Sequence, residues 1–235
     1  MHLNYCYYCL LHFLSIYYIT RCLKGGCEMP STFLEDSDVR QIMRALPKDQ
    51  LWHSSYVGIF VRLLTAKISG CGLYRELAQA KEYRYFGDAA FYHDIGKAWV
   101  PQEILSKPGA LTGEETRMVR KHTLFAEMLF KQIDGGSVSG MPKHLIRLAH
   151  DSAVYHHEWW NGQGYPYGLS QEEIPLVARV TSICDVYDAI MSDRPYRRAH
   201  SYEYACREIE ANAGTQFDPA IAQIFLDSEA IFKSI

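Results

Sequence analysis

The sequence predicts an all-α protein, a compact multi-helix bundle of about seven or eight helices. Apolar residues recur at steps of three and four along most of the chain, and no stretch alternates apolar and polar residues as a half-buried strand does. Helix start and stop signals divide the chain at intervals typical of globular helices. At 235 residues, 48% of them hydrophobic and 22% charged, the chain can form one well-cored domain, or one domain with an appendage.

Proline, glycine and capping residues predict where each helix begins and ends. A short helix ends near Pro47, and the strongly amphipathic helix after it is closed by Gly70. Thr112 and Glu115 have the spacing of a capping box, and Ser201 can cap a later helix. The expected helices cover residues 37–46, 50–69, 73–93, 114–133, 142–159, 174–192 and 201–214, with a last one beginning at Asp218-Pro219.

The N-terminal segment differs in composition from the rest of the chain. Residues 1–23 are rich in Tyr, Cys and Leu, are barely apolar enough to span a membrane, and lack the basic stretch that opens a signal peptide. Residues 24–29 can be encoded by a purine-rich run shortly before an ATG, which is typical of a bacterial ribosome-binding site. We therefore interpret residues 1–28 as a mis-annotated extension or a weak apolar segment, residues 29–48 as a lead-in helix, and 49–235 as the main domain.

Charge and cysteine content indicate the surroundings of the protein. A net charge of −3 argues against a nucleic-acid polymer as partner, because such binding needs clustered Lys and Arg. The seven cysteines are odd in number and irregularly spaced, which makes a poor disulfide framework. We therefore expect a reduced, cytoplasmic location and no membrane association.

Histidine and aspartate residues at seven positions form the candidate chemical site. They include one His-Asp pair and one His-His pair, and their nitrogen and oxygen donors suit Zn, Mn or Fe. Adjacent residues on a helix point about 100° apart, so the two side chains of a pair cannot both be ligands at one small site unless two metals lie side by side. A carboxylate can bridge two metals roughly 3.5–4 Å apart, which share a hydroxide that attacks phosphorus. The seven residues are His53, His93, Asp94, His122, His156, His157 and Asp185.

A second His-Asp pair provides an internal comparison. His150-Asp151 is not followed by Ile-Gly-Lys, as His93-Asp94 is. We interpret this pair as structural, together with His144 and His200. The predicted metal site therefore does not depend on counting His-Asp dipeptides.

The motifs around these residues occur in a fixed order. They are HDIGK (93–97), ILSKPGAL (104–111), MVRKH (118–122), HHEWWNGQGYPYGL (156–169), ARVTSICDVYDAIMSDRPYR (178–197) and GTQFDP (214–219). This series, with Gly164-Tyr165-Pro166 in the fourth motif, resembles the HD-GYP family, bacterial cyclic di-GMP phosphodiesterases within the HD hydrolase superfamily. The resemblance runs from about His53 to Phe225 and implies an HD-domain bundle, with an HD-GYP catalytic domain over residues 49–235.

The resemblance also implies a role for each site residue. The seven His and Asp residues would be ligands of two divalent metal ions, Fe or Mn, with Asp94 as the bridge. Lys97 would lie beside the scissile phosphate, where it stabilises negative charge or protonates the leaving oxygen. Tyr165, Arg194 and Arg197 would bind the phosphates and bases of the substrate, since an Arg fork suits phosphate.

Three positions depart from the family pattern. Asp49 stands where members with a third metal carry a Glu, and its side chain is one methylene shorter, so a third metal is uncertain. Asn161 replaces the usual acidic residue and follows Trp159-Trp160, which changes how this loop packs or stacks a base. Cys184 stands where a small Ala is common. Every one of the seven ligand positions is filled.

The reaction implied by the resemblance is hydrolysis of a 3′–5′ phosphodiester in cyclic di-GMP through a metal-bridging hydroxide. The products would be linear pGpG and, on further cleavage, GMP. A hybrid cyclic GMP-AMP or another phosphate ester is an alternative substrate, because the motifs do not identify the bases. A non-enzymatic module that binds signalling proteins is a second alternative, which missing ligands would favour; signalling-protein partners or a homodimer are compatible with either interpretation.

Overall fold

The computed structural model describes residues 38–71, 74, 82–193 and 198–233, which form an all-α bundle as the sequence predicts. Within these ranges the β-type pairing consists of two isolated bridges. No helix in the described part of the chain is long and apolar enough to cross a bilayer. The elements are α2 (Asp38–Arg44), α3 (Lys48–Gly70), η2 (Glu82–Tyr85), α5 (Phe86–Ala90), η3 (Ile95–Trp99), α6 (Gln102–Leu105), α7 (Gly113–Arg120), α8 (His122–Asp134), α9 (Lys143–Tyr155), η4 (Gln171–Glu173), α10 (Leu176–Met191), α11 (Tyr202–Ala211), α12 (Pro219–Leu226) and α13 (Glu229–Phe232).

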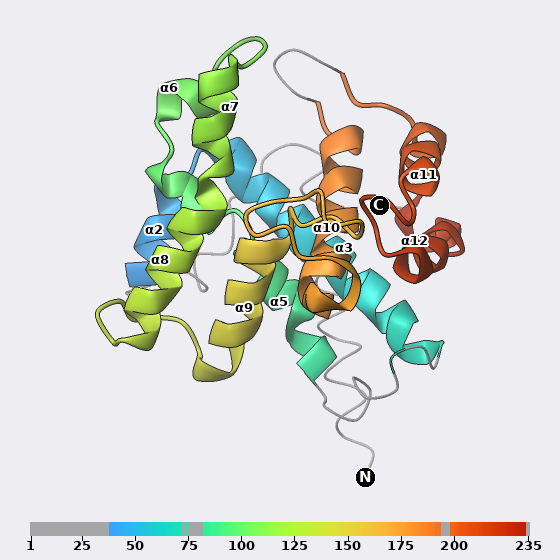
Figure 1. Ribbon diagram of the computed structural model, residues 1–235, viewed down its shortest axis with the longest axis horizontal. Helices are drawn as coiled ribbons and strands as arrows, with labels where there is room; N and C mark the ends of the chain where they lie inside the picture. The colour runs from blue at the N-terminus through green and yellow to red at the C-terminus, as the bar shows by residue number, and fades with distance from the viewer. Residues whose placement is uncertain (1–37, 72–73, 75–81, 194–197, 234–235) are drawn as a thin grey trace, which may run out of the picture.

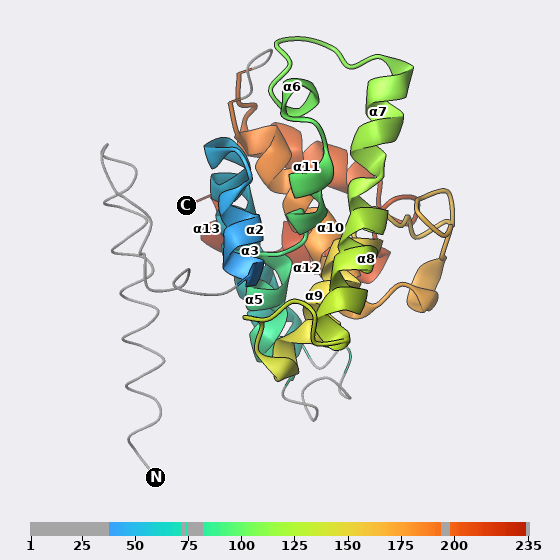
Figure 2. The ribbon, with the colours of Figure 1, turned by 90° about the vertical axis from the view of Figure 1, so that its left-hand side faces the viewer.

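The long helix α3 lies at the centre of the bundle (Figure 1). It packs against α5 and α10, while α9 contacts α5, α8 and α10. Helices α11 and α12 pack against α10 and against each other (Figure 1). Helices α6 and α7 lie together at one end of the molecule (Figure 2). The helices that carry the candidate site residues are therefore joined by a chain of contacts from α3 through α5 and α10 to α9 and α8, although they are far apart in the sequence.

A contact between backbones sets the spacing of α3 and α5. A Cβ atom added at Gly58 would lie 2.8 Å from the carbonyl oxygen of Gly87, and one added at Gly87 would lie 2.6 Å from that of Gly58. A side chain at either position would force the helices apart, because a packed interior has no free space to accept it. Since α3 carries His53 and the turn after α5 carries His93, this contact helps to fix the distance between two candidate ligands.

Aromatic rings join the C-terminal helices to the centre of the bundle. Tyr187 of α10 packs edge-to-face on Phe60 of α3, with ring centroids 5.0 Å apart, and on Phe225 of α12, 5.2 Å apart. The Tyr187 hydroxyl donates a hydrogen bond to the carbonyl oxygen of Phe232 over 3.0 Å. All four residues are buried, and each aromatic pair contributes about 0.5–1.5 kcal/mol beyond the area it buries. These contacts hold α10, and with it Asp185, in place.

The capping residues expected from the sequence are confirmed. The Glu115 amide donates to Thr112 Oγ1 over 3.2 Å, and the Thr112 amide donates to the Glu115 carboxylate over 2.7 Å, which completes the capping box. The Ser201 hydroxyl accepts from the Tyr204 amide, and Asp218 accepts from the first amides of α12. These signals are readable in the sequence because donor and acceptor lie three or fewer residues apart.

Three predicted helices have wrong ends, and each error falls at a histidine of the candidate site. The predicted helix 73–93 ends at Ala90 (72–73 and 75–81 lie outside the described residues), 114–133 breaks at Lys121, and 142–159 ends at Tyr155. At each break an imidazole Nδ1 donates to a backbone carbonyl three or four residues back, which stabilises the end of the helix. These breaks and short helices such as α6 and α13 give eleven α-helices in the described ranges rather than seven or eight.

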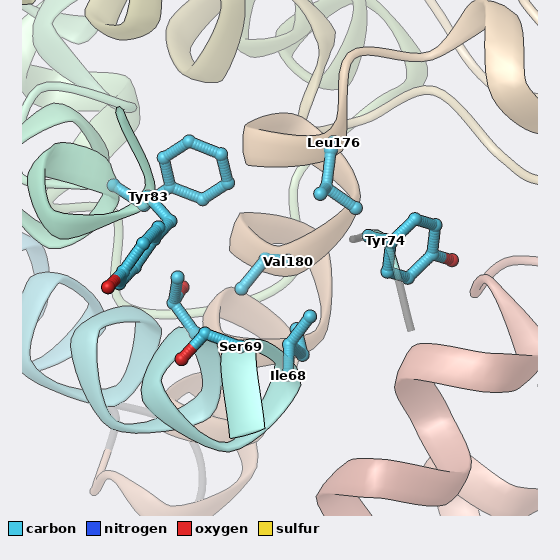
Figure 3. A pocket seen from close by; sticks show the side chains of 8 residues that line it. Ile68, Ser69, Tyr74, Tyr83, Leu176 and Val180 are labelled. Carbon is cyan, nitrogen blue, oxygen red and sulfur yellow. The ribbon is translucent and has the colours of Figure 1, made fainter. Parts of the chain in front are cut away.

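A small cavity lies between α3 and α10 (Figure 3). Its lining is mostly apolar and includes Ile68, Leu176 and Val180, with Tyr74 and Tyr83 beside them. Its volume of about 10 Å³ is the space of one water molecule. It shares no lining residue with the candidate site, and we assign it no function.

Asp218, in the GTQFDP motif, links three parts of the fold. Its buried carboxylate caps α12 and accepts hydrogen bonds from Arg179 Nη1 of α10 and from the Tyr74 hydroxyl, each over 2.8 Å. Close by, the amides of residues 160–161 donate to the carbonyl oxygens of residues 215–216. The motif therefore anchors the loop that carries the Gly-Tyr-Pro sequence.

Replacing Asp218 with alanine should lower the free energy of unfolding by about 3–5 kcal/mol, because Arg179 would be left buried and unpaired. Urea unfolding followed by circular dichroism measures this loss. As a control, Asp88→Ala removes the ion pair with Arg62, whose partners have side chains 48% and 53% exposed, and should cost less than about 1 kcal/mol. Equal losses in the two variants would contradict the structural role given to Asp218.

Candidate metal centre

Five segments that are distant in the sequence bring the seven candidate residues into one cluster. The segments are α3, the turn after α5, the start of α8, the turn after α9, and α10. The donor atoms form three overlapping groups, in each of which all donors lie within 4.8 Å of one another. They are the histidine–aspartate group (His53, His93, Asp185), the all-histidine group (His122, His156, His157), and a group of His93, Asp94 and His156 that joins them.

The histidine–aspartate group surrounds one carboxylate oxygen. Asp185 Oδ1 lies 3.0 Å from His53 Nε2 and 3.8 Å from His93 Nε2. The two imidazole nitrogens are themselves 3.3 Å apart. Three donors from three elements therefore point at a common position, which is the arrangement of an open metal site.

Asp94 lies between the two groups and presents one carboxylate oxygen to each. Its Oδ2 is 3.3 Å from His93 Nε2 and 3.7 Å from His53 Nε2. Its Oδ1 is 3.4 Å from His122 Nε2 and 4.0 Å from His156 Nε2. This is the position of a carboxylate that can bridge two metal ions.

Three buried polar atoms of the cluster lack a hydrogen-bond partner among the described residues. They are Asp94 Oδ1, His122 Nε2 and His156 Nε2. An unpaired buried polar atom costs about 1–3 kcal/mol, so a fold retains three in one place only for a reason. A divalent cation coordinated by these atoms would satisfy all three. The residues present therefore fit a metal ion at this position.

The imidazole rings are oriented through the nitrogen that faces away from the cluster. His93, His122 and His156 each donate through Nδ1 to a backbone carbonyl, over 2.8, 2.7 and 2.9 Å. Such bonds fix the tautomer and the ring angle and leave Nε2 as the free donor atom. The hydrogen bonds that accompany the unexpected helix ends therefore also aim the three rings at the cluster.

Asp188, which the sequence analysis did not single out, orients His53. Its Oδ2 accepts a hydrogen bond from His53 Nδ1 over 2.6 Å and one from Ser192 Oγ over 3.3 Å. Asp188 is buried and lies three residues after Asp185, so the two carboxylates share a face of α10. Two aspartates at this spacing on a predicted helix are the signal that could have identified it.

The pKa values of Asp94, Asp185, His122 and His157 favour the protonation states that metal binding requires, whereas the pKa of His53 opposes metal binding. Burial would raise the pKa of Asp94 and of Asp185. Lys97 and nearby imidazoles hold the pKa of Asp94 well below its usual range, and nearby imidazoles do the same for Asp185. Burial lowers the pKa of His122 to about 4 and that of His157 to about 3, so both rings are neutral at pH 7. Burial also lowers the pKa of His53, but the carboxylates of Asp185, Asp188 and Asp94 outweigh it and raise this pKa to about 9. Metal binding would therefore displace a proton from His53.

Lys97 lies at the edge of the cluster. Its Nζ donates to Asp94 Oδ2 over 2.6 Å and to Gln50 Oε1 over 3.0 Å. It belongs to η3, which approaches α8 so closely that a Cβ at Gly96 would overlap the carbonyl oxygen of His122. In the HDIGK motif, Gly96 therefore allows η3 to lie close to α8, and Lys97 places a positive charge beside Asp94. The sequence analysis did not identify Gln50.

A cavity of about 280 Å³ opens onto the cluster. Its walls include Gln50, Lys97 and Tyr165 in addition to five of the candidate ligands. Tyr165 stacks on His157, with ring centroids 4.7 Å apart and an angle of 22° between the planes. The guanidinium carbon of Arg120, a residue that the sequence analysis also did not identify, lies 5.0 Å from the centroid of the Tyr165 ring. The cavity therefore offers metal-binding donors, one cation and an aromatic wall.

The loop that carries Tyr165 is held in place by the carboxylate of Glu158 and packs closely against the backbone of the same residue. Glu158 is buried and accepts hydrogen bonds from the amides of Tyr167 and Leu169, over 2.7 and 3.1 Å. A Cβ at Gly164 would overlap the backbone of Glu158, so this position of the motif needs glycine. Asn161 accepts from the amide two residues later, which makes a local turn and gives this departure from the family pattern a structural use.

Of the other residues singled out in the sequence, some are outside the described ranges and the rest do not belong to the three donor groups. Arg194 and Arg197 are outside the described residues. Asp49 is exposed in the first turn of α3 and belongs to none of the three donor groups, so a third metal remains only a prediction. His150 and Asp151 bond to each other over 2.9 Å and are also outside these groups, in line with a structural role.

Comparison with known proteins agrees with the motifs. The HD domain family matches residues 64–221. A probable cyclic di-GMP phosphodiesterase of Vibrio cholerae is 36% identical over 176 residues, which cover 75% of this chain and 40% of that protein. A 3′3′-cGAMP-specific phosphodiesterase of the same species is 32% identical over 140 residues, 60% of this chain and 25% of that protein. The chain spans less than half the length of these relatives.

A solved structure shows the same fold. It is an HDG"Y"P protein from Bdellovibrio bacteriovorus, with a TM-score of 0.52 and 17% identity, and the match covers 74% of this chain and 51% of that one. At this identity the likeness concerns the fold alone. The match to the HD domain shows that this chain belongs to the HD domain family, and the ordered motifs with the similarity to the Vibrio cholerae proteins assign it to the HD-GYP branch.

Replacing Asp188 with asparagine should weaken metal binding about 10- to 100-fold, because the partner of a ligating imidazole tunes its orientation and basicity. Titration with Mn²⁺ against a fluorescent chelator measures the change. Asp227→Asn, which alters an exposed carboxylate at the end of α12, serves as the control and should bind as the wild type does. Unchanged affinity in Asp188→Asn would show that His53 does not depend on this hydrogen bond.

Proposed function

We propose that this chain is a metal-dependent phosphodiesterase that hydrolyses cyclic di-GMP to pGpG and, on further cleavage, to GMP. The observation that carries the proposal is the position of Asp94, which presents one oxygen to each of two groups of donors. The relatives described above, named as phosphodiesterases of cyclic dinucleotides, support the substrate class.

In this proposal the histidine–aspartate group and the all-histidine group hold one divalent ion each, and Asp94 is shared between them. Fe or Mn suits a set of imidazole and carboxylate donors. When bound, such a pair of ions would supply a hydroxide nucleophile at neutral pH and would stabilise charge on the entering and leaving oxygens. The protein contributes fixed donors, because hydrogen bonds from the opposite ring nitrogen orient His53 and His93.

Lys97 brings a positive charge to the reacting phosphate. Its ammonium group lies at the wall of the cavity, held between Asp94 and Gln50. From there it stabilises the negative charge that develops on phosphorus, or gives a proton to the departing 3′-oxygen. Either role needs the ammonium group near the diester but does not need it to bind a metal.

Tyr165 and the two arginines of the RPYR motif complete the proposed substrate site. The Tyr165 ring lines the cavity and is held by stacking on His157, and we assign it to the phosphates and bases of the substrate. Arg194 and Arg197 follow α10 in the sequence, and we assign them to the phosphates of the substrate because guanidinium groups bind phosphate oxygens in pairs.

A substrate panel tests the proposal. Anaerobically purified full-length protein, loaded with Mn²⁺ or Fe²⁺, is incubated with cyclic di-GMP, 3′3′-cGAMP and linear pGpG, and the products are separated by chromatography. We expect cyclic di-GMP to be converted to pGpG, with GMP appearing later. Metal-loaded protein that leaves all cyclic dinucleotides intact would overturn the proposal.

3′3′-cGAMP is the second candidate substrate. It is favoured by the similarity to a phosphodiesterase named as specific for this dinucleotide. The two candidates share the reaction and differ in one base, so the ratio of kcat/KM values from the same panel distinguishes them. A higher kcat/KM for 3′3′-cGAMP than for cyclic di-GMP would make 3′3′-cGAMP the preferred substrate and leave the proposed metal chemistry unchanged.

A further inference from the structure

Arg120 lies next to the candidate site but takes no part in the cluster of donors. It is the last residue of α7 and is exposed, and its guanidinium group lies over the ring of Tyr165. Tyr165 in turn lines the cavity and stacks on His157 of the all-histidine group. Arg120 and His157 therefore both contact the ring of Tyr165 at the wall of the cavity.

The charge of Arg120 is not neutralised by a carboxylate within the described ranges of the chain. Its recorded side-chain contact is the cation–π interaction with Tyr165, worth about 0.5–1 kcal/mol at an exposed site. Lys97 and Arg179, by contrast, each pair with a carboxylate, that of Asp94 and that of Asp218. Arg120 is therefore a pre-positioned cation beside the cavity that can accept an anionic group of a ligand.

A cyclic dinucleotide has two phosphodiesters, and only one of them can occupy the metal centre at a time. The other must lie farther out, together with the ribose and base that connect the two. A guanidinium group matches phosphate geometry better than an ammonium group does, and an arginine already stacked on an aromatic ring has less side-chain freedom to lose. The position of Arg120, against the Tyr165 ring that also stacks on His157, suits this second diester.

We propose that Arg120 is a specificity-determining residue that binds the non-scissile phosphodiester of a cyclic dinucleotide, with Tyr165 as its platform. This inference rests on the function proposed above. It assigns the discrimination between a dinucleotide ring and a simple phosphodiester to a residue on α7, outside the metal ligands and outside the RPYR motif.

The test compares Arg120→Gln with the wild type on two substrates, cyclic di-GMP and bis(p-nitrophenyl) phosphate, which has a single phosphorus. For the cyclic dinucleotide KM should rise about 10- to 100-fold with little change in kcat, as expected for the loss of a charge-assisted hydrogen bond. The loss in kcat/KM should be at least about tenfold smaller for the simple diester, and Arg120→Lys should recover part of the affinity.

Arg117→Gln is the matched control, because Arg117 lies three residues earlier on α7, has a 70% exposed side chain and lies 3.9 Å from Glu114. It should show wild-type kinetics on both substrates. An unchanged KM for cyclic di-GMP in Arg120→Gln, or equal losses on both substrates, would overturn the role of Arg120 while the proposed function stands. A wild-type protein that cleaves the simple diester but no cyclic dinucleotide would overturn both.

Discussion

Replacing Asp94 with alanine should abolish hydrolysis and metal loading together. Both groups of donors lose the carboxylate that they share, and the ring nitrogens of His93 and His122 lose the negative charge 3.3 and 3.4 Å away. We expect kcat/KM to fall at least about 1,000-fold, since a metal pair contributes several kcal/mol to the transition state. Elemental analysis after desalting should show a fall from about two metal ions per chain to less than one.

The chain supplies its own control for this prediction. Asp151 belongs to a second His-Asp pair, with His150, that lies outside the donor groups. Asp151→Ala should therefore keep both its metal ions and its activity. If Asp94→Ala hydrolysed cyclic di-GMP at the wild-type rate, the assignment of Asp94 would be wrong. Loss of metal in both variants would point to a general loss of structure.

Replacing Lys97 with alanine should lower kcat about 100- to 1,000-fold while both metal ions stay bound. Lys97 supplies no metal ligand, and its ammonium group reaches the cavity from η3. The negative charge of Asp94, which Lys97 balances in the protein described here, would be balanced by the metal ions in the loaded enzyme. Steady-state kinetics and elemental analysis of the same preparation measure the two effects separately.

Lys107→Ala is the comparison variant, because Lys107 also forms a 2.6 Å ion pair, with Glu115, but outside the cavity. It should retain wild-type turnover. If Lys97→Ala lost its metal ions, the role of Lys97 would be to hold Asp94 rather than to act on the phosphate. A normal kcat in Lys97→Ala would remove it from the reaction altogether.

The sequence was sufficient to predict the helical fold and the residues that converge. Local signals such as the Thr112–Glu115 capping box operate over three residues and could be read directly. The His-Asp and His-His doublets could be identified because adjacent side chains on a helix point in different directions, so that both can be metal ligands only if two metal ions lie side by side. The convergence that this interpretation requires is present in the fold.

The sequence was insufficient where a contact depends on tertiary structure. Helix ends at Ala90 and Tyr155 were missed because the stabilising acceptors are backbone carbonyls, which no residue type marks. Gln50 was missed because its partner Lys97 lies 47 residues away, so that only the fold brings them together. Asp188 was a different case, since its spacing from Asp185 was visible but its hydrogen bond to α3 was not.

Anomalous diffraction from crystals grown anaerobically with Mn²⁺ or Fe²⁺ tests the central claim most directly. The account predicts two peaks roughly 3.5–4 Å apart, one within each group of donors, with the Asp94 carboxylate between them. A single peak, or peaks away from the histidine–aspartate and all-histidine groups, would contradict it.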